Sequence, residues 1–141
     1  MGASVDGYAS DMTRVLSTGS PSKRVRDLYN AVAEAQLASI DSVKAGIPAA
    51  NVDRAARSVL RKHKLDRMFV HSTGHGLGLE IHEPPRVAKK EKTILRAGMV
   101  ITIEPGAYIE GFAGVRIEDT VLVTDNGCEV LTPTPKELFK I

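Results

Sequence analysis

The segment from His71 to Pro85 constrains this chain more than any other stretch of its sequence. It places three imidazoles and two carboxylates within thirteen residues, with three glycines between them. Glycine lets a backbone pass close to a bound ion or substrate because it carries no Cβ atom. Such a density of metal-binding side chains predicts a functional site, and the surrounding glycines, prolines and β-branched residues favour strands and functional loops.

The composition predicts a globular, non-membrane protein. The 141 residues are enough to bury a core, and 43% hydrophobic with 26% charged residues is ordinary for a folded domain. The apolar runs, such as Met99–Ile103, are far shorter than the roughly 20 residues that a membrane span needs. A single cysteine, Cys128, and the lack of a visible secretory signal favour a cytoplasmic location.

The charge pattern argues against a nucleic-acid partner. The formal net charge is only +2, and lysines and arginines are scattered apart from the short basic runs at 61–64 and 89–90, which are typical of solvated surface. Tryptophan is absent and aromatic residues make up 4% of the chain, so no basic stripe is interleaved with stacking side chains. We therefore expect neither nucleic acid nor a membrane as partner.

The first half of the sequence predicts a hairpin and two helices. Residues 2–16 alternate loosely between apolar and polar, as in a β-hairpin. Ser20–Pro21 is typical of a helix start, and apolar residues then recur at helical spacing until Gly46, a suitable C-cap. A second helix is expected from about Asn51 to about Lys64.

The second half predicts strands. Met99–Ile109 and Val115–Thr124 have the residues of two long strands, with a tight turn at Asn126–Gly127 and a short returning strand at Glu129–Leu131. We expect residues 132–135 to close the sheet and the last residues to form a helical turn. With no repeat or linker visible, the pattern predicts one α+β domain with a mostly antiparallel sheet.

Side-chain alternation in these strands sorts the acidic residues. Residues two apart in a strand share a face of the sheet. The side chain of Glu118 is therefore expected on the same face as that of Arg116, and Asp119 on the other face. Thr102 and Glu104 likewise point together. Because an unpaired buried carboxylate is costly, two inward glutamates imply cations or hydrogen-bond donors between them.

These residues predict a metal site. Asp11 on the hairpin arm, His75, Glu104 and Glu118 come from four separate elements and offer three carboxylates and one imidazole. Such a set suits manganese, cobalt, iron or zinc in a two-metal centre, which predicts metal-assisted hydrolysis.

Each of these residues also has a structural interpretation. Asp11, next to Ser and Thr, is also typical of a turn hydrogen-bond acceptor, and most lone histidines are structural. Glu118 and Asp119 could form a salt-bridged sheet face. Four structural accidents are harder to accept together than one metal site.

Four ordered motifs resemble those of the pita-bread metallopeptidases, in the aminopeptidase P and Xaa-Pro dipeptidase (prolidase) branch. They are Gly2–Arg14, His71–Pro85, Gly98–Tyr108 and Gly114–Thr120. The resemblance covers nearly the whole chain. It implies an α+β pita-bread fold, with helices packed on a mostly antiparallel, curved sheet. It also implies that residues 1–141 form a single, N-terminally incomplete peptidase catalytic domain.

The resemblance implies a ligand set and a general base. Asp11 and Glu118 would bridge two metal ions, while His75 and Glu104 would complete the shell of the second ion. Glu104 would also act as general base toward a water that the metals activate. Manganese is the expected metal, and cobalt, zinc and iron stay open.

The resemblance also implies the residues that meet the substrate. His71 and His82 would contact a peptide with proline at its second position and stabilise the tetrahedral intermediate, so they join Glu104 as catalytic residues. Arg116 would pair with site carboxylates, and Tyr108 would donate a hydrogen bond. The product would be a residue released from in front of proline.

One departure from the family pattern concerns the first metal ligand. The family has an Asp eleven residues before the second ligand, and that position falls just before Met1. We therefore expect one incomplete metal site and poor hydrolysis. There are three alternatives: an inactive pita-bread binding module, a methionine-aminopeptidase-like enzyme and a metal-free, creatinase-like amidinohydrolase. Whether the chain forms a homodimer stays open. The choice between dipeptides and longer peptides as substrates also stays open.

Overall fold

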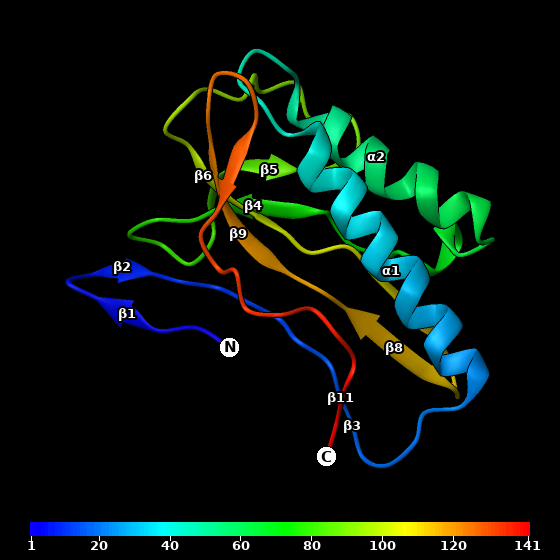
Figure 1. Cartoon of the computed structure of the whole chain (residues 1–141). Helices are drawn as coiled ribbons and strands as arrows, with labels where there is room; N and C mark the ends of the chain where they lie inside the picture. Colours follow the sequence, from blue (N-terminus) through cyan, green and yellow to red (C-terminus); the bar gives the residue numbers. More distant parts are fainter.

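A computed structural model describes all residues, 1–141, and shows two helices packed on one face of an antiparallel sheet (Figure 1). The helices are α1 (Lys23–Ser42) and α2 (Ala49–Lys62), and a short 3-10 helix, η1 (Asp66–Met68), follows them. This arrangement confirms the α+β prediction. No helix combines the length and the apolar character that a bilayer crossing demands.

The main sheet has five strands in the spatial order β10-β9-β6-β4-β5, and all neighbours are antiparallel. Its strands are β4 (Gly74–Gly76), β5 (Glu83–Val87), β6 (Val100–Ile103), β9 (Asp119–Val123) and β10 (Cys128–Val130). β10 follows the turn at 126–127 and pairs with β9, which confirms the predicted returning strand.

The two long predicted strands are each divided. The chain leaves β6 at Glu104–Pro105 and continues as β7 (Gly106–Ile109), which pairs with β8 (Ala113–Arg116) in a separate ribbon. Ile117 and Glu118 then separate β8 from β9. Pro105 has no N–H for a ladder hydrogen bond, which explains the first interruption. Both interruptions fall at a glutamate predicted to bind metal.

The ends of the chain differ from the sequence prediction. The predicted hairpin exists but is shorter, with β1 (Ser4–Val5) and β2 (Tyr8–Ala9) joined by a turn at Asp6 and Gly7. The predicted C-terminal helical turn is wrong. Instead, β11 (Phe139–Lys140) pairs in parallel with β3 (Leu16–Ser17), so backbone hydrogen bonds with a distant segment replace those of a local turn.

The helix boundaries shift by a few residues. α1 begins after Ser22, whose hydroxyl accepts a bond from the Val25 N–H at 3.3 Å, and it ends before Gly46 because Val43 turns away and is buried in the core. α2 begins two residues earlier than predicted, with Pro48 at its N-cap.

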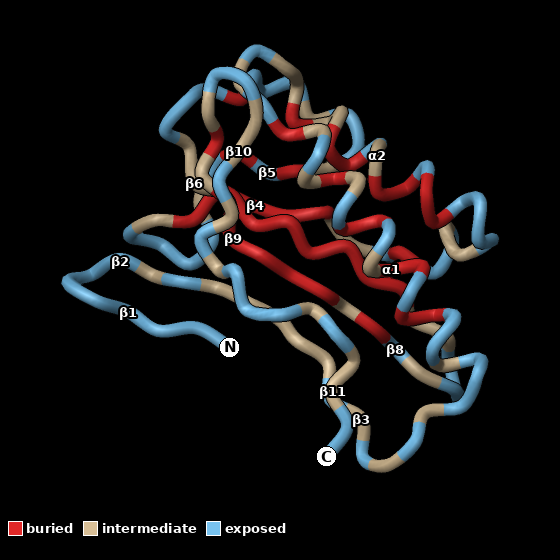
Figure 2. The backbone as a smooth tube through the Cα atoms, viewed as in Figure 1, coloured by how far each residue is buried: buried red, intermediate tan, exposed pale blue.

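Two apolar clusters hold the helices on the strands. The first joins both helices to β7 and β8, and the second joins the α1–α2 connection and α2 to β6 and β9. Figure 2 shows buried residues along the strands and the inner helix faces, whereas the β1–β2 hairpin is exposed. The buried sheet is a rigid support for the loops and strand ends that carry the predicted ligands.

Leu60 on α2 has no exposed surface and belongs to the first cluster. Leu60→Ala should lower the free energy of unfolding by about 2–5 kcal/mol, because it leaves a cavity that the core fills only partly. Urea unfolding followed by circular dichroism measures this. Leu37→Ala, at a half-exposed site on α1, is the matched control and should change stability by less than about 0.5 kcal/mol; equal effects would contradict the core assignment.

Candidate metal centre

The four predicted ligands meet at one end of the sheet. The ligand atoms of Asp11, His75 and Glu118 lie within 4.8 Å of one another, and Glu104 Oε1 lies 3.4 Å from His75 Nε2. His75 is on β4, Glu104 follows β6, Glu118 precedes β9 and Asp11 lies two residues after β2. The structure therefore brings together the whole set that the sequence predicted.

Local backbone contacts hold these residues in place. The Glu104 N–H donates to the Thr73 carbonyl at 2.7 Å, just beyond the end of β6. Thr13 and Glu118 form an isolated bridge, in which each N–H donates to the other residue's carbonyl at 3.3 and 3.2 Å. The Thr13 hydroxyl also donates to Glu118 Oε2 at 2.5 Å. The strand interruptions thus expose two glutamates to the same space while keeping their backbones paired.

His75 presents a lone pair to this space. Its Nδ1 lies 2.9 Å from the Gly76 carbonyl, which can only accept, so Nδ1 carries the proton and Nε2 is free to coordinate. Burial lowers the pKa of His75, which favours this neutral form. The backbone N–H of His75 donates to the Thr102 hydroxyl, and this hydroxyl lies 3.4 Å from Glu104 Oε1.

The cluster is rich in hydrogen-bond acceptors and poor in hydrogen-bond donors. Burial raises the pKa of Glu104 to about 7, and the charges of Glu118 and Asp11 add to this effect. Burial, followed by the charge of Asp11, also raises the pKa of Glu118. Three carboxylates and a neutral imidazole nitrogen repel one another unless a proton or a cation lies among them. This set of oxygen and nitrogen ligands fits a divalent metal ion.

Glu104 should make the metal-free chain less stable as pH rises. The folded chain holds the Glu104 proton more tightly than the unfolded chain, whose carboxyl has a pKa near 4.5. The wild type should therefore lose about 2 kcal/mol relative to Glu104→Gln between pH 4.5 and 7, with solvent screening allowed for, and no more above pH 7.

Urea unfolding of both chains in the presence of a chelator measures this difference. Both chains share all other titratable groups, so the difference reports the replacement of Glu104, including its 3.4 Å contact with His75. A difference that stays constant from pH 4 to pH 8 would contradict the raised pKa.

His71, Tyr108 and Arg116 form a hydrogen-bonded chain beside Glu104. The Arg116 Nε–H donates to the Tyr108 hydroxyl at 2.9 Å, and that hydroxyl lies 3.0 Å from His71 Nε2. His71 Nδ1 donates to the Ser72 carbonyl at 2.8 Å, so Nε2 is the acceptor and the Tyr108 hydroxyl is the donor in the neutral ring. Arg116 Nε also lies 3.7 Å from Glu104 Oε2.

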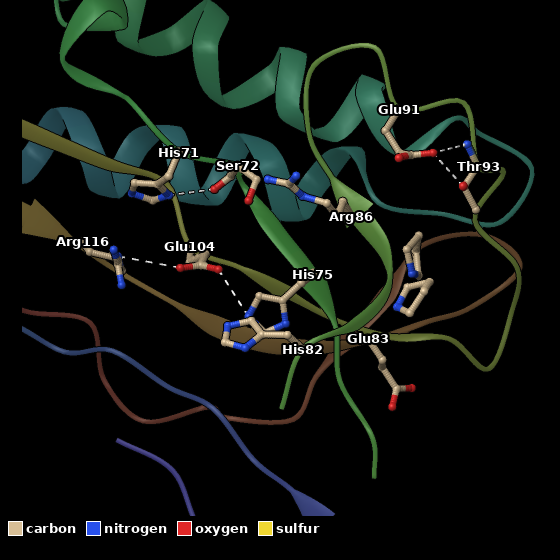
Figure 3. A pocket seen from close by; sticks show the side chains of 12 residues that line it. His71, Ser72, His75, His82, Glu83, Arg86, Glu91, Thr93, Glu104 and Arg116 are labelled. Carbon is tan, nitrogen blue, oxygen red and sulfur yellow. Dashed lines mark hydrogen bonds and ion pairs between the residues drawn. The ribbon is translucent and has the colours of Figure 1, made fainter. Parts of the chain in front are cut away.

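Figure 3 shows Glu104 between Arg116 and His75, with His82 against the His75 ring. The two imidazole centroids are 4.2 Å apart, and His82 is exposed at the mouth of the site. By contrast, Glu83 has a local role, because its carboxylate accepts a bond from the Glu80 N–H at 3.3 Å. The predicted substrate histidines therefore flank the ligand set from two sides.

A cavity of about 690 Å³ opens at this site and extends past the predicted residues. Sequence reasoning missed Arg86, which lies on β5 directly across from His75 and is exposed in this cavity. The apolar neighbours Pro85 and Val87 indicate that Arg86 faces the other way, but only the pairing of β5 with β4 brings it to the site. Glu91 and Thr93 also line the cavity, and the Thr93 N–H and hydroxyl donate to Glu91 Oε1 at 2.9 and 2.7 Å.

Comparison with known proteins identifies the same branch that the motifs resemble. The sequence model of metallopeptidase family M24 matches residues 1–125. The Xaa-Pro dipeptidase of Pyrococcus furiosus is 48% identical over 139 residues, which are 99% of this chain and 40% of that protein.

Solved structures agree with this result. A prolidase structure from Pyrococcus furiosus matches with a TM-score of 0.94 and 47% identity, over 96% of this chain and 40% of that one. An X-Pro aminopeptidase from Thermotoga maritima matches with a TM-score of 0.96 and 40% identity, over 99% of this chain and 40% of that one. The chain spans about 40% of the length of these relatives.

Proposed function

The chain belongs to metallopeptidase family M24, in its Xaa-Pro dipeptidase and aminopeptidase P branch, and has the pita-bread fold of this family; from this membership we propose that it carries the catalytic site of a metallo-exopeptidase. The reaction is hydrolysis of the peptide bond before proline, and residues 1–141 form part of one catalytic domain. The observation that carries the proposal is the convergence of Asp11, His75 and Glu118, with Glu104 beside His75.

The four clustered side chains are the proposed metal ligands. Asp11 and Glu118 would hold the metal ions together with His75 and Glu104, the latter two serving the same ion. When bound, divalent ions such as manganese lower the pKa of a water molecule and polarise the scissile carbonyl. Manganese is the metal of choice for a first experiment because a carboxylate-rich set with one imidazole suits it.

The remaining site residues handle protons and substrate. Glu104 would accept a proton from the attacking water, because its carboxylate lies beside the coordinating nitrogen of His75, at 3.4 Å. Arg116, 3.7 Å from Glu104, keeps that carboxylate oriented. His71 and His82 contact the peptide on either side of the ligands and stabilise the tetrahedral intermediate.

We expect one tight manganese equivalent per chain. His75 and Glu104 serve a single ion, so a second ion would have only the two bridging carboxylates as ligands in these 141 residues. Calorimetric titration of the chelator-treated chain measures the stoichiometry. Two tight equivalents would contradict this ligand assignment.

Turnover of Xaa-Pro peptides with added manganese tests the function. Proline release from a dipeptide, compared with cleavage of a longer Xaa-Pro peptide, separates dipeptidase from aminopeptidase activity, and a peptide that begins with methionine and lacks proline tests the methionine-specific alternative. Glu104→Gln should remove the turnover, whereas Glu110→Gln, an exposed glutamate after β7, should keep it. A folded chain that neither binds manganese nor cleaves peptides would favour a binding module.

A further inference from the structure

Asp119 is a buried carboxylate that follows Glu118 in the sequence but points away from the ligand set. It has no exposed surface, and all its bonds go to protein donors. Oδ1 accepts from Arg14 at 2.7 Å and from the Thr132 hydroxyl at 2.9 Å. Oδ2 accepts from Gln36 of α1 at 2.8 Å and from Lys136 at 2.6 Å. A carboxylate that accepts hydrogen bonds from four donors is held in one position.

Arg14 connects Asp119 to the backbone on both sides of the site. Its Nη1 donates to the Thr13 carbonyl at 2.9 Å and to the Glu118 carbonyl at 2.6 Å. Its other N–H groups donate to Asp119 and to the carbonyls of residues 132, 134 and 135, at 2.7–3.2 Å. One guanidinium therefore holds the hairpin arm, the start of β9 and the C-terminal segment together.

The two segments joined by Arg14 carry Asp11 and Glu118. The Thr13 hydroxyl donates to Glu118 Oε2 at 2.5 Å, and the Thr120 hydroxyl donates to the Asp11 carbonyl at 2.7 Å. Thr13 and Thr120 are neighbours of Arg14 and Asp119, respectively. Any movement of this ion pair is therefore passed to the backbone of both carboxylates.

We propose that Arg14 and Asp119 are positioning residues, which fix the spacing of the Asp11 and Glu118 carboxylates and so set the affinity for the metal. This inference rests on the proposed function. Neither residue belongs to the ligand set, and neither lines the cavity. Their effect acts through Thr13, Thr120 and the paired backbones.

Conservative variants separate positioning from folding. Arg14→Lys keeps a cation for Asp119, but a single ammonium cannot also reach the carbonyls of both Thr13 and Glu118. Asp119→Asn keeps the shape, but its amide group faces Arg14 or Lys136 as a donor against a donor. Leu60→Ala is the control for lost stability, because Leu60 is fully buried in the first apolar cluster and belongs neither to the ligand set nor to the cavity.

Manganese titration by calorimetry, with melting temperatures for each chain, tests the proposal. Arg14→Lys and Asp119→Asn should bind manganese about 10–100-fold more weakly than the wild type. Leu60→Ala should also lower the melting temperature and keep the wild-type affinity. Unchanged affinity in both Arg14→Lys and Asp119→Asn, or an equal loss of affinity in Leu60→Ala, would overturn the positioning role.

A wild-type chain that binds no manganese would instead refute the proposed metal site. Crystal structures of the metal-free wild-type and Asp119→Asn chains then decide the positioning role by themselves. A changed spacing between the Asp11 and Glu118 carboxylates supports it, and an unchanged spacing overturns it.

Discussion

Glu118→Gln should weaken manganese binding at least about 100-fold, while it raises the stability of the metal-free chain at pH 8. The amide keeps the size of the side chain but removes the negative charge from the bridging position. Because burial and the charge of Asp11 raise the pKa of Glu118, the ionised carboxylate costs folding free energy when no cation is present. The variant escapes this cost.

Opposite changes in affinity and stability are the mark of a ligand. Neutralising a carboxylate that only supported the fold would lower the free energy of unfolding and leave the metal affinity of the folded chain near that of the wild type. Calorimetry with manganese and urea unfolding in a chelator measure the two quantities. Glu129→Gln, an exposed position on β10, is the control and should leave both unchanged; wild-type affinity in Glu118→Gln would remove Glu118 from the ligand set.

The grouping of Asp11, His75, Glu104 and Glu118 could be predicted from sequence because strand alternation and glycine content are local signals. Alternation placed Glu118 and Asp119 on opposite faces, and the structure confirms this, since Asp119 bonds to Gln36 of α1 while Glu118 lies with His75 and Asp11. Pro105 after Glu104 is a further local signal, because β6 ends just before this pair, although the pattern from Met99 to Ile109 predicts one strand. Such features depend on a few neighbouring residues, so a pattern is enough to find them.

The rest depends on contacts between distant segments, which no local pattern encodes. The parallel pair of β3 and β11 joins the two ends of the chain, and nothing in residues 136–141 indicates it. The division at Ile117 and Glu118 was missed because their β-branched neighbours favour one continuous strand, whereas the bridge to Thr13 competes for the same backbone groups. Arg86 was missed because only the β4–β5 register places it opposite His75.

Gly74→Ala should have the largest effect on the fold of any glycine-to-alanine substitution in this chain. A Cβ at this position would lie 1.8 Å from the Thr102 carbonyl oxygen and 2.7 Å from its carbon, both of them backbone atoms of β6. Overpacking of this kind costs about 3 kcal/mol or more, because neither strand can move without breaking the ladder around it.

The same substitution should also damage the metal site, since β4 carries His75 next to Gly74 and pairs with β6 just before Glu104. Urea unfolding measures the loss of stability, and manganese titration of any folded fraction measures the displacement of His75. Gly127→Ala is the matched control, because its added Cβ meets no atom within 4 Å. Wild-type stability in the Gly74→Ala chain would show that the backbones of β4 and β6 are not in close contact at this position. Wild-type metal affinity would show that this close approach does not place His75 beside Glu104.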